Sequence, residues 1–196
     1  MVNKFLSGAI IIICFVFSIS SCNSNQQHNT ANSKKNSHDS IESFTADSFA
    51  YYENVLLKDS SNTELRLALA TNYYADKKFD KAIDHLLKIY RKDPKNSEVI
   101  ITLGNVYYDA EEYENAIIYY EKALVVDKKN VNVRCDLATC YLNIKKPEIA
   151  CTLLKKNLEL DYNHAQSHHN LSVVYNQLGK TKEAEEEMKI FNKLSR

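Results

Sequence analysis

The chain has 196 residues, and its 25 lysine and arginine residues balance its 25 aspartate and glutamate residues. This balance disfavours partners that are bound through a strong global field, namely nucleic acid and anionic membrane surfaces. Only three Gly and two Pro occur, whereas Tyr is frequent at 13, which favours one all-helical domain over a domain rich in tight turns.

The amino-terminal segment has the pattern of an export signal. Lys4 is followed by a short apolar run over 5–19, and Cys22 comes directly after two serines. The run is shorter than the roughly 20 apolar residues that a membrane-spanning helix needs. Its end resembles the lipobox of bacterial lipoproteins, which implies a signal peptide over 1–21 and lipidation of Cys22. An uncleaved signal anchor is the alternative, and it would also hold the chain at a membrane.

The next two segments differ sharply in their apolar content. Residues 22–43 contain almost no large apolar side chain. They bury too little surface to offset the entropy of ordering, so a disordered tether is predicted. Residues 44–58 have apolar side chains at helical spacing, which predicts a lone helix. With its loop, this N-terminal packing helix spans 44–62 and is expected to cover the repeats that follow.

From residue 63 onward the sequence repeats every 34 residues without insertion or deletion. The four copies span 63–96, 97–130, 131–164 and 165–196, and positions are numbered within this frame. A repeat of this length predicts pairs of helices, A and B, stacked one pair on the next. Three positions define the pattern: a small residue at position 8 (Ala70, Gly104, Ala138 and Ser172), Tyr at position 11 (Tyr73, Tyr107, Tyr141 and Tyr175) and Ala at position 20 (Ala82, Ala116, Ala150 and Ala184).

This pattern resembles the tetratricopeptide repeat over about 63–196. The resemblance implies an all-α fold, a right-handed α-solenoid of stacked helix-turn-helix units with one extra N-terminal helix. Small residues at positions 8 and 20 are expected to let helices A and B approach closely, and the tyrosine at position 11 to fill the wedge toward the next helix. The Trp that the family often has at position 4 is absent, and Arg66, Ile100, Arg134 and His168 occupy that position.

In the family, helix A of each repeat lines a concave groove that binds partner proteins, through positions 2, 5, 9 and 12. Aromatic side chains there give broad contact area, and amides can bond to a peptide backbone. Some of the apolar residues suit packing between neighbouring helices equally well. Position 5 holds no Lys, so the carboxylate clamp of chaperone-binding relatives is not expected. The predicted groove residues are Leu67, Tyr74, Ile101, Asn105, Tyr108, Leu142, His169 and Asn176.

Two clusters of reactive side chains fall short of a catalytic or metal site. His164, His168 and His169 lie close in sequence, but they project differently and are interpreted as solvent-facing or groove-lining. Cys140 and Cys151 could form a disulfide, while buried free thiols are the simpler interpretation. No pattern supplies a base beside a cysteine. We therefore expect no enzyme activity, no metal and no cofactor.

The last predicted helix, over 181–194, leaves Ile190 or Leu194 partly uncovered. It is interpreted either as a frayed end or as a docking edge for a second copy.

Taken together, these patterns predict a lipoprotein whose repeat domain scaffolds protein complexes in the bacterial cell envelope. The lipid would hold it at a membrane, on the periplasmic side of the outer membrane. Its expected partner is an envelope protein or an extended peptide segment, and nucleic acid is not expected. The alternative is a structural envelope protein that self-associates, for example as a homodimer, through its terminal helix.

Overall fold

The computed structural model describes residues 49–196, and every regular element in that range is an α-helix. The predicted signal peptide, Cys22 and the predicted tether lie outside the described residues, as does the 44–48 part of the predicted packing helix. Residues 49–58 are helical. None of the helices described in 49–196 is long and apolar enough to cross a membrane.

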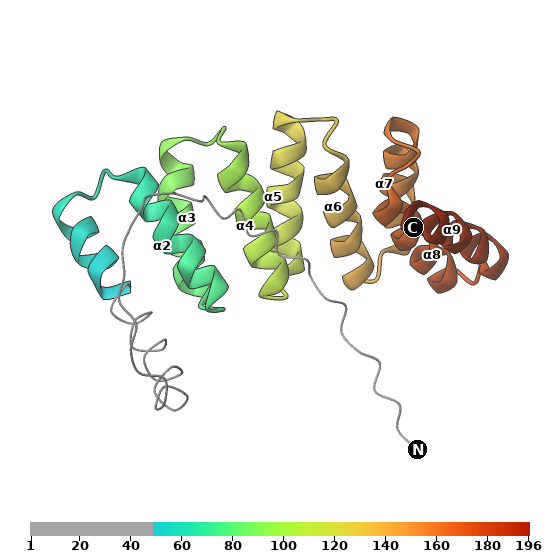
Figure 1. Ribbon diagram of the computed structural model, residues 1–196, viewed down its shortest axis with the longest axis horizontal. Coiled ribbons are helices and arrows are strands. Elements are labelled where there is room, and N and C mark those ends of the chain that lie inside the picture. Colours follow the sequence, from blue (N-terminus) through green and yellow to red (C-terminus); the bar gives the residue numbers. More distant parts are fainter. Residues whose placement is uncertain (1–48) are drawn as a thin grey trace, which may run out of the picture. The chain divides into compact units, whose positions relative to one another are not determined.

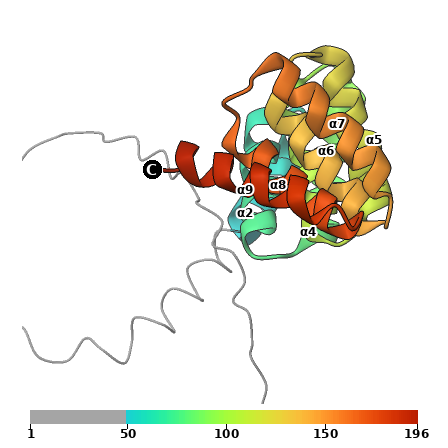
Figure 2. The same ribbon diagram turned by 90° about the vertical axis from the view of Figure 1, so that its right-hand side faces the viewer.

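Eight helices follow within the described residues and form four pairs (Figure 1). Each helix packs against the next one in the chain, and α6 also contacts α8. The last pair, α8 and α9, lies side by side in both views (Figures 1 and 2). The prediction of an all-α solenoid of stacked helix pairs is confirmed. The A helices are α2 (Thr63–Ala75), α4 (Ser97–Asp109), α6 (Val131–Asn143) and α8 (Ala165–Gln177), and the B helices are α3 (Phe79–Lys92), α5 (Tyr113–Val126), α7 (Pro147–Leu160) and α9 (Thr181–Leu194).

The A helices begin at side-chain caps that recur in phase with the repeat. Asn62, Asn96 and Asn130 each accept a hydrogen bond from the backbone N–H three residues on, at 2.9, 3.1 and 3.1 Å. His164 takes this place in the last repeat, where its Nδ1 accepts such a bond at 3.2 Å. Burial lowers the pKa of His164, which favours the neutral ring that an accepting nitrogen requires. Pro147 occupies the first turn of α7, where its missing N–H costs nothing.

Helices A and B of each pair meet at positions 8, 20 and 24. The small residues at positions 8 and 20 are all buried. Position 24 is Leu86, Leu154 or Met188 in three repeats, but it is Tyr120 in the second, the repeat that has Gly104 at position 8. A Cβ on Gly104 would lie 2.5 Å from Cε1 and 2.7 Å from Cδ1 of Tyr120. The larger residue on α5 is therefore accommodated by the smaller residue on α4.

Tyrosines at position 11 contact both the helix before their pair and helix B of their own pair. Tyr73 stacks on Phe49 with ring centroids 4.4 Å apart, and its hydroxyl donates to Glu53 at 2.9 Å. The hydroxyl of Tyr141 donates to Glu121, on the B helix of the preceding repeat, at 3.1 Å. The ring of Tyr107 stacks on that of Tyr119 on α5, with centroids 5.4 Å apart. These tyrosines therefore fill space toward the helix that follows, as predicted, and also toward the preceding helix. The helical residues 49–58 supply that neighbour for the first repeat.

Position 4, where the family often has Trp, holds a buried polar side chain that contacts helix B in three repeats and the buried apolar Ile100 in the second. Arg66 on α2 lies 3.5 Å from Nδ1 of His85 on α3. Arg134 on α6 donates to Oδ1 of Asn157 on α7 at 3.0 Å. These contacts join the two helices and give partners to polar groups that would otherwise be costly to bury, although Nε of Arg66 is buried without a hydrogen-bond partner.

The turn between helices A and B contains a left-handed residue at position 15 of every repeat. The backbone angle φ is 58° at Lys77, 62° at Glu111, 61° at Lys145 and 72° at Gly179. An L side chain in this conformation costs about 1 kcal/mol, which glycine does not incur.

We expect Gly104→Ala to lower the free energy of unfolding by about 1–3 kcal/mol, because the added Cβ overlaps the Tyr120 ring. Adding Tyr120→Leu should recover part of that loss, so the two changes are not additive in chemical denaturation. Ser172→Ala is the matched control at position 8, and it should change stability by less than about 0.5 kcal/mol. Additive losses in the double variant would contradict the pairing.

Lys145→Gly should raise the free energy of unfolding by about 0.5–1 kcal/mol, since glycine relieves the positive φ. Gly179→Ala should lower it by a similar amount through the backbone alone, because a Cβ there meets nothing within 4 Å. Urea titration followed by circular dichroism measures both. A loss of stability in Lys145→Gly would show that the turn is not strained.

Candidate functional site

The surface that the repeat packing leaves open on the A helices is the candidate site. We define the helix-A face as positions 2, 5, 6, 9, 12 and 13 of α2, α4, α6 and α8. All the predicted groove residues belong to these positions. Leu67, Tyr74, Ile101, Asn105, Tyr108 and His169 are half-buried, Leu142 is buried and Asn176 is exposed.

The apolar members of the helix-A face serve packing more than the sequence suggests. Leu142 is 8% exposed and lies in the core formed by the last two repeats, so it offers no contact surface. Leu67 and Ile101 pack against buried clusters while staying half-buried. The ring of His169 lies 5.0 Å from that of Phe191 on α9. The helix-A face therefore offers a partner fewer apolar side chains than the list of predicted groove residues suggests.

Hydrogen bonds run across the helix-A face from one repeat to the next. The hydroxyl of Tyr74 donates to Oδ2 of Asp109 at 2.5 Å, and the amide of Asn143 donates to the hydroxyl of Tyr108 at 3.5 Å. Both bonds join position 12 of one repeat to position 13 of the following repeat. The amide of Asn170 on α8 also donates to a hydroxyl on α6 at 3.0 Å. Burial and the bond to Asp109 raise the pKa of Tyr74, so this hydroxyl keeps its proton and remains a donor.

Asp136 is a charged group on this face without a counter-ion. Its side chain is exposed, and it takes part in none of the ion pairs formed among the described residues. Partial desolvation by the protein around it raises the pKa of Asp136 from its ordinary value of 3.8 to about 6. Burial, with the charge of Asp136 as the next cause, also raises the pKa of Cys135 and of Cys140 to about 12. The chain thus keeps an acidic group in surroundings that penalise its charge.

Asp109, Asp136 and Asn143 are not among the predicted groove residues. They occupy positions 6 and 13, each one residue from a predicted position. The helical period of 3.6 could have found them, since a stripe through positions 2, 5, 9 and 12 is also bordered by positions 6 and 13.

The histidine and cysteine clusters belong to the fold. His168 is 1% exposed, with Nδ1 2.5 Å from Glu187 and Nε2 donating to the carbonyl of Tyr162 at 2.7 Å. The expectation of a solvent-facing or groove-lining His168 is therefore wrong, because position 4 faces helix B. Within 49–196 no three or more His, Cys, Asp or Glu residues are grouped so as to hold a metal ion. The cysteines in this range are free thiols: Cys135, Cys140 and Cys151.

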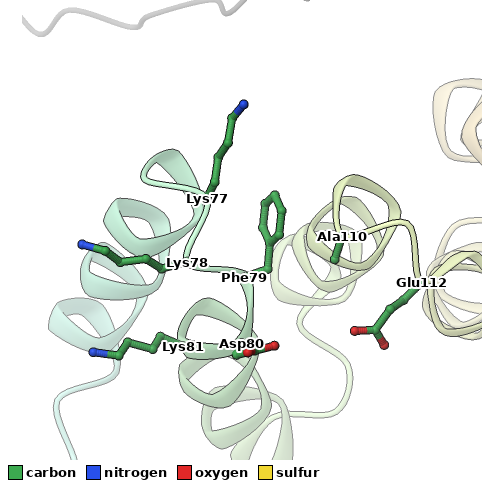
Figure 3. Close-up of a pocket in the computed structure, with 7 residues that line it drawn as sticks. All are labelled: Lys77, Lys78, Phe79, Asp80, Lys81, Ala110 and Glu112. Atoms are coloured by element: carbon green, nitrogen blue, oxygen red, sulfur yellow. The ribbon is translucent and has the colours of Figure 1, made fainter.

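A hollow of about 510 Å³ lies between the A–B turns of the first two repeats (Figure 3). In Figure 3 the amino groups of Lys78 and Lys81 point away from Ala110 and Glu112. Lys78 pairs with Asp76 at 3.1 Å, and Lys81 lies over an aromatic ring of the core. These lysines do not converge on a common point, so the hollow is a weaker candidate than the helix-A face. Its lining residues are Lys77, Lys78, Phe79, Asp80, Lys81, Ala110 and Glu112.

Two family models match the chain. Residues 44–97 match the model described as tetratricopeptide repeat, and residues 109–189 match the model described as anaphase-promoting complex, cyclosome, subunit 3. Comparison with curated protein sequences gives no match.

Solved structures with a similar fold include two of MamA and one of YrrB. A MamA crystal structure has a TM-score of 0.70 at 18% identity and covers 84% of this chain and 96% of that chain. MamA MSR-1 has a TM-score of 0.66 at 24% identity, with 81% and 91% covered. YrrB, described as a TPR protein with an unusual peptide-binding site, has a TM-score of 0.66 at 21% identity, with 79% and 80% covered. At these identities the likeness concerns the fold.

Asp136→Asn should stabilise the fold at neutral pH. Because the pKa of Asp136 is raised from 3.8 to about 6, the folded chain binds this proton more tightly than the unfolded chain does. The stability that proton binding contributes is fully present below pH 3.8 and is lost as the pH rises through 6. At pH 7.5 the variant should gain about 1 kcal/mol, a value discounted for the solvent screening of an exposed side chain. Below pH 3.8 the variant and the parent chain should unfold alike.

Thermal or urea unfolding at several pH values measures this difference. Glu114→Gln, an exposed change on α5, is the control and should show no such pH-dependent gain. An unchanged or lower stability of Asp136→Asn at pH 7.5 would mean that the carboxylate carries no desolvation cost.

Proposed function

The chain is a tetratricopeptide-repeat protein, and on this basis we propose that it is a scaffold that binds another protein through its helix-A face. The observation that carries the proposal is the series of hydrogen bonds from Tyr74 to Asp109 and from Asn143 to Tyr108. These bonds hold aromatic and polar side chains in place on the helix-A face, where all the predicted groove residues except Leu142 remain at least partly exposed. Such preorganised side chains lose little freedom on binding, which favours recognition.

An extended peptide segment is the partner that suits this surface. Asn105 accepts a hydrogen bond from the hydroxyl of Tyr120 at 2.8 Å, which leaves its amide N–H groups free to donate to a peptide carbonyl. The half-buried rings of Tyr74 and Tyr108 offer apolar area with a polar tip. YrrB, whose fold is similar, is described as having a peptide-binding site, in keeping with a segment of this kind.

In this proposal the scaffold is a lipoprotein of the bacterial cell envelope. A lipid on Cys22 holds it at the periplasmic side of the outer membrane, and residues 22–43 connect the lipid to the repeats. The support is the sequence around Cys22, which follows a short apolar run and two serines. The role is one of binding and not of catalysis.

Site-specific photocrosslinking in cells tests the binding surface. Crosslinkers at Thr71 and Thr102 on the helix-A face should yield adducts with an envelope protein. Crosslinkers at the exposed positions Glu114 and Thr152 on the B helices are the controls and should yield none. The same adducts from both sets would contradict binding through this face, and adducts joining two copies through α9 would favour the self-associating alternative.

Metabolic labelling with a fatty-acid precursor tests the anchor separately. The parent chain should incorporate the label and fractionate with the outer membrane, whereas Cys22→Ala should do neither. Cys14→Ala, a change within the apolar run, is the matched control and should keep the label. Labelling that survives in Cys22→Ala would overturn the lipoprotein assignment without bearing on the helix-A face.

A further inference from the structure

We propose that the segment bound by the helix-A face is basic, and that one of its Lys or Arg side chains pairs with Asp136. This inference rests on the proposed scaffold function and adds the chemistry of the partner. It follows from how charge is distributed over the two sets of helices, from the exposed and unpaired carboxylate of Asp136, and from the neutral groups on the same face.

Charge is divided unevenly between the A and B helices. The four A helices contain no lysine, although the chain as a whole has equal numbers of acidic and basic residues. Their basic residues are Arg66 and Arg134, which are 8% and 4% exposed and direct their guanidinium groups inward, to Ser60 and Asn157 among others. The acidic residues of the A helices are Glu64, Glu98, Asp109 and Asp136, all exposed.

The helix-A face therefore presents negative charge that no cation of the same helices offsets. An electrostatic field of one sign favours partners of the opposite sign and disfavours like-charged ones. Nucleic acid, phosphorylated segments and acidic peptides are all repelled by such a face. A basic segment is attracted to it.

Asp136 is the acidic residue best suited to pair with an incoming cation. Asp109 already accepts the Tyr74 hydroxyl, and the two glutamates lie in the first turns of their helices, where the helix dipole stabilises them. Asp136 has no such support: it forms none of the ion pairs found among the described residues, and its side chain is exposed to an incoming cation. A cation that arrives at Asp136 therefore replaces no existing ion pair, and the attraction between the two charges is not shared with another protein group.

Neutral groups on the same face can bind the rest of the segment. Asn105, with its free amide N–H groups, and Tyr108 belong to α4. Asp136 belongs to α6, which is the A helix of the following repeat. Backbone contacts from these groups are compatible with many sequences, whereas the contact to Asp136 requires a basic residue. The charge therefore supplies the selectivity.

Fluorescence anisotropy with the purified full-length chain tests the inference. The probes are three labelled 12-residue peptides in which glycine alternates with lysine, glutamine or glutamate. The lysine peptide should bind most tightly, and Asp136→Asn should weaken it about tenfold. Glu114→Gln also removes one exposed negative charge, but from α5, and it should change the affinity less than twofold. Unfolding curves of both variants confirm that they are folded.

The outcomes separate this inference from the proposed function. Equal weakening in the two variants would mean non-specific charge attraction and would overturn the role of Asp136. Tighter binding of the glutamine or glutamate peptide, together with crosslinks from the helix-A face, would overturn the basic partner while leaving the scaffold function intact. Loss of binding of all peptides and of those crosslinks would remove both. A tighter lysine-peptide complex in the Lys34→Gln, Lys35→Gln double variant would identify the chain's own segment as occupant and overturn a separate partner.

Discussion

The rest of the structure depends on the close approach of the two helices within each repeat. Position 8 on helix A meets position 24 on helix B, and the space between them is so tight that a Cβ on Gly104 would overlap the ring of Tyr120. Because protein interiors are packed as densely as organic crystals, this contact sets how each pair is oriented and therefore where the next pair docks. The period of 34 residues in the sequence reflects this constraint, because each pair needs small residues at the same positions.

One side of every A helix remains open once this packing is complete. Its positions 8 and 11 pack against neighbouring helices, and position 4 is buried in every repeat, for example in the contact between His168 and Glu187. What remains is the helix-A face, with tyrosines held by bonds to the following repeat and with the uncompensated carboxylate of Asp136. In the proposed function, the unpaired carboxylate of Asp136 attracts a basic partner, and binding sites often trade stability for activity in this way.

The sequence reveals the features that recur and not those that depend on a partner helix. Small residues at positions 8 and 20 in constant phase predict the stacked helix pairs, and Pro147 marks a helix start. The caps at Asn62, Asn96 and Asn130 recur just as regularly and could have been found in the same way. By contrast, the burial of Leu142 and of His168, and the raised pKa of Asp136, depend on which side chains arrive from neighbouring helices. Periodicity within one helix does not contain that information.

The most direct test of the account is to map, by NMR of the isotope-labelled chain, which amides shift when the lysine-bearing peptide is added. The account predicts that the largest shifts cluster on α4 and α6, around Asn105, Asp136 and Thr139, while amides on the outer sides of α5 and α7 stay unchanged. Shifts concentrated on α5 and α7, or on the turns that line the hollow in Figure 3, would contradict it.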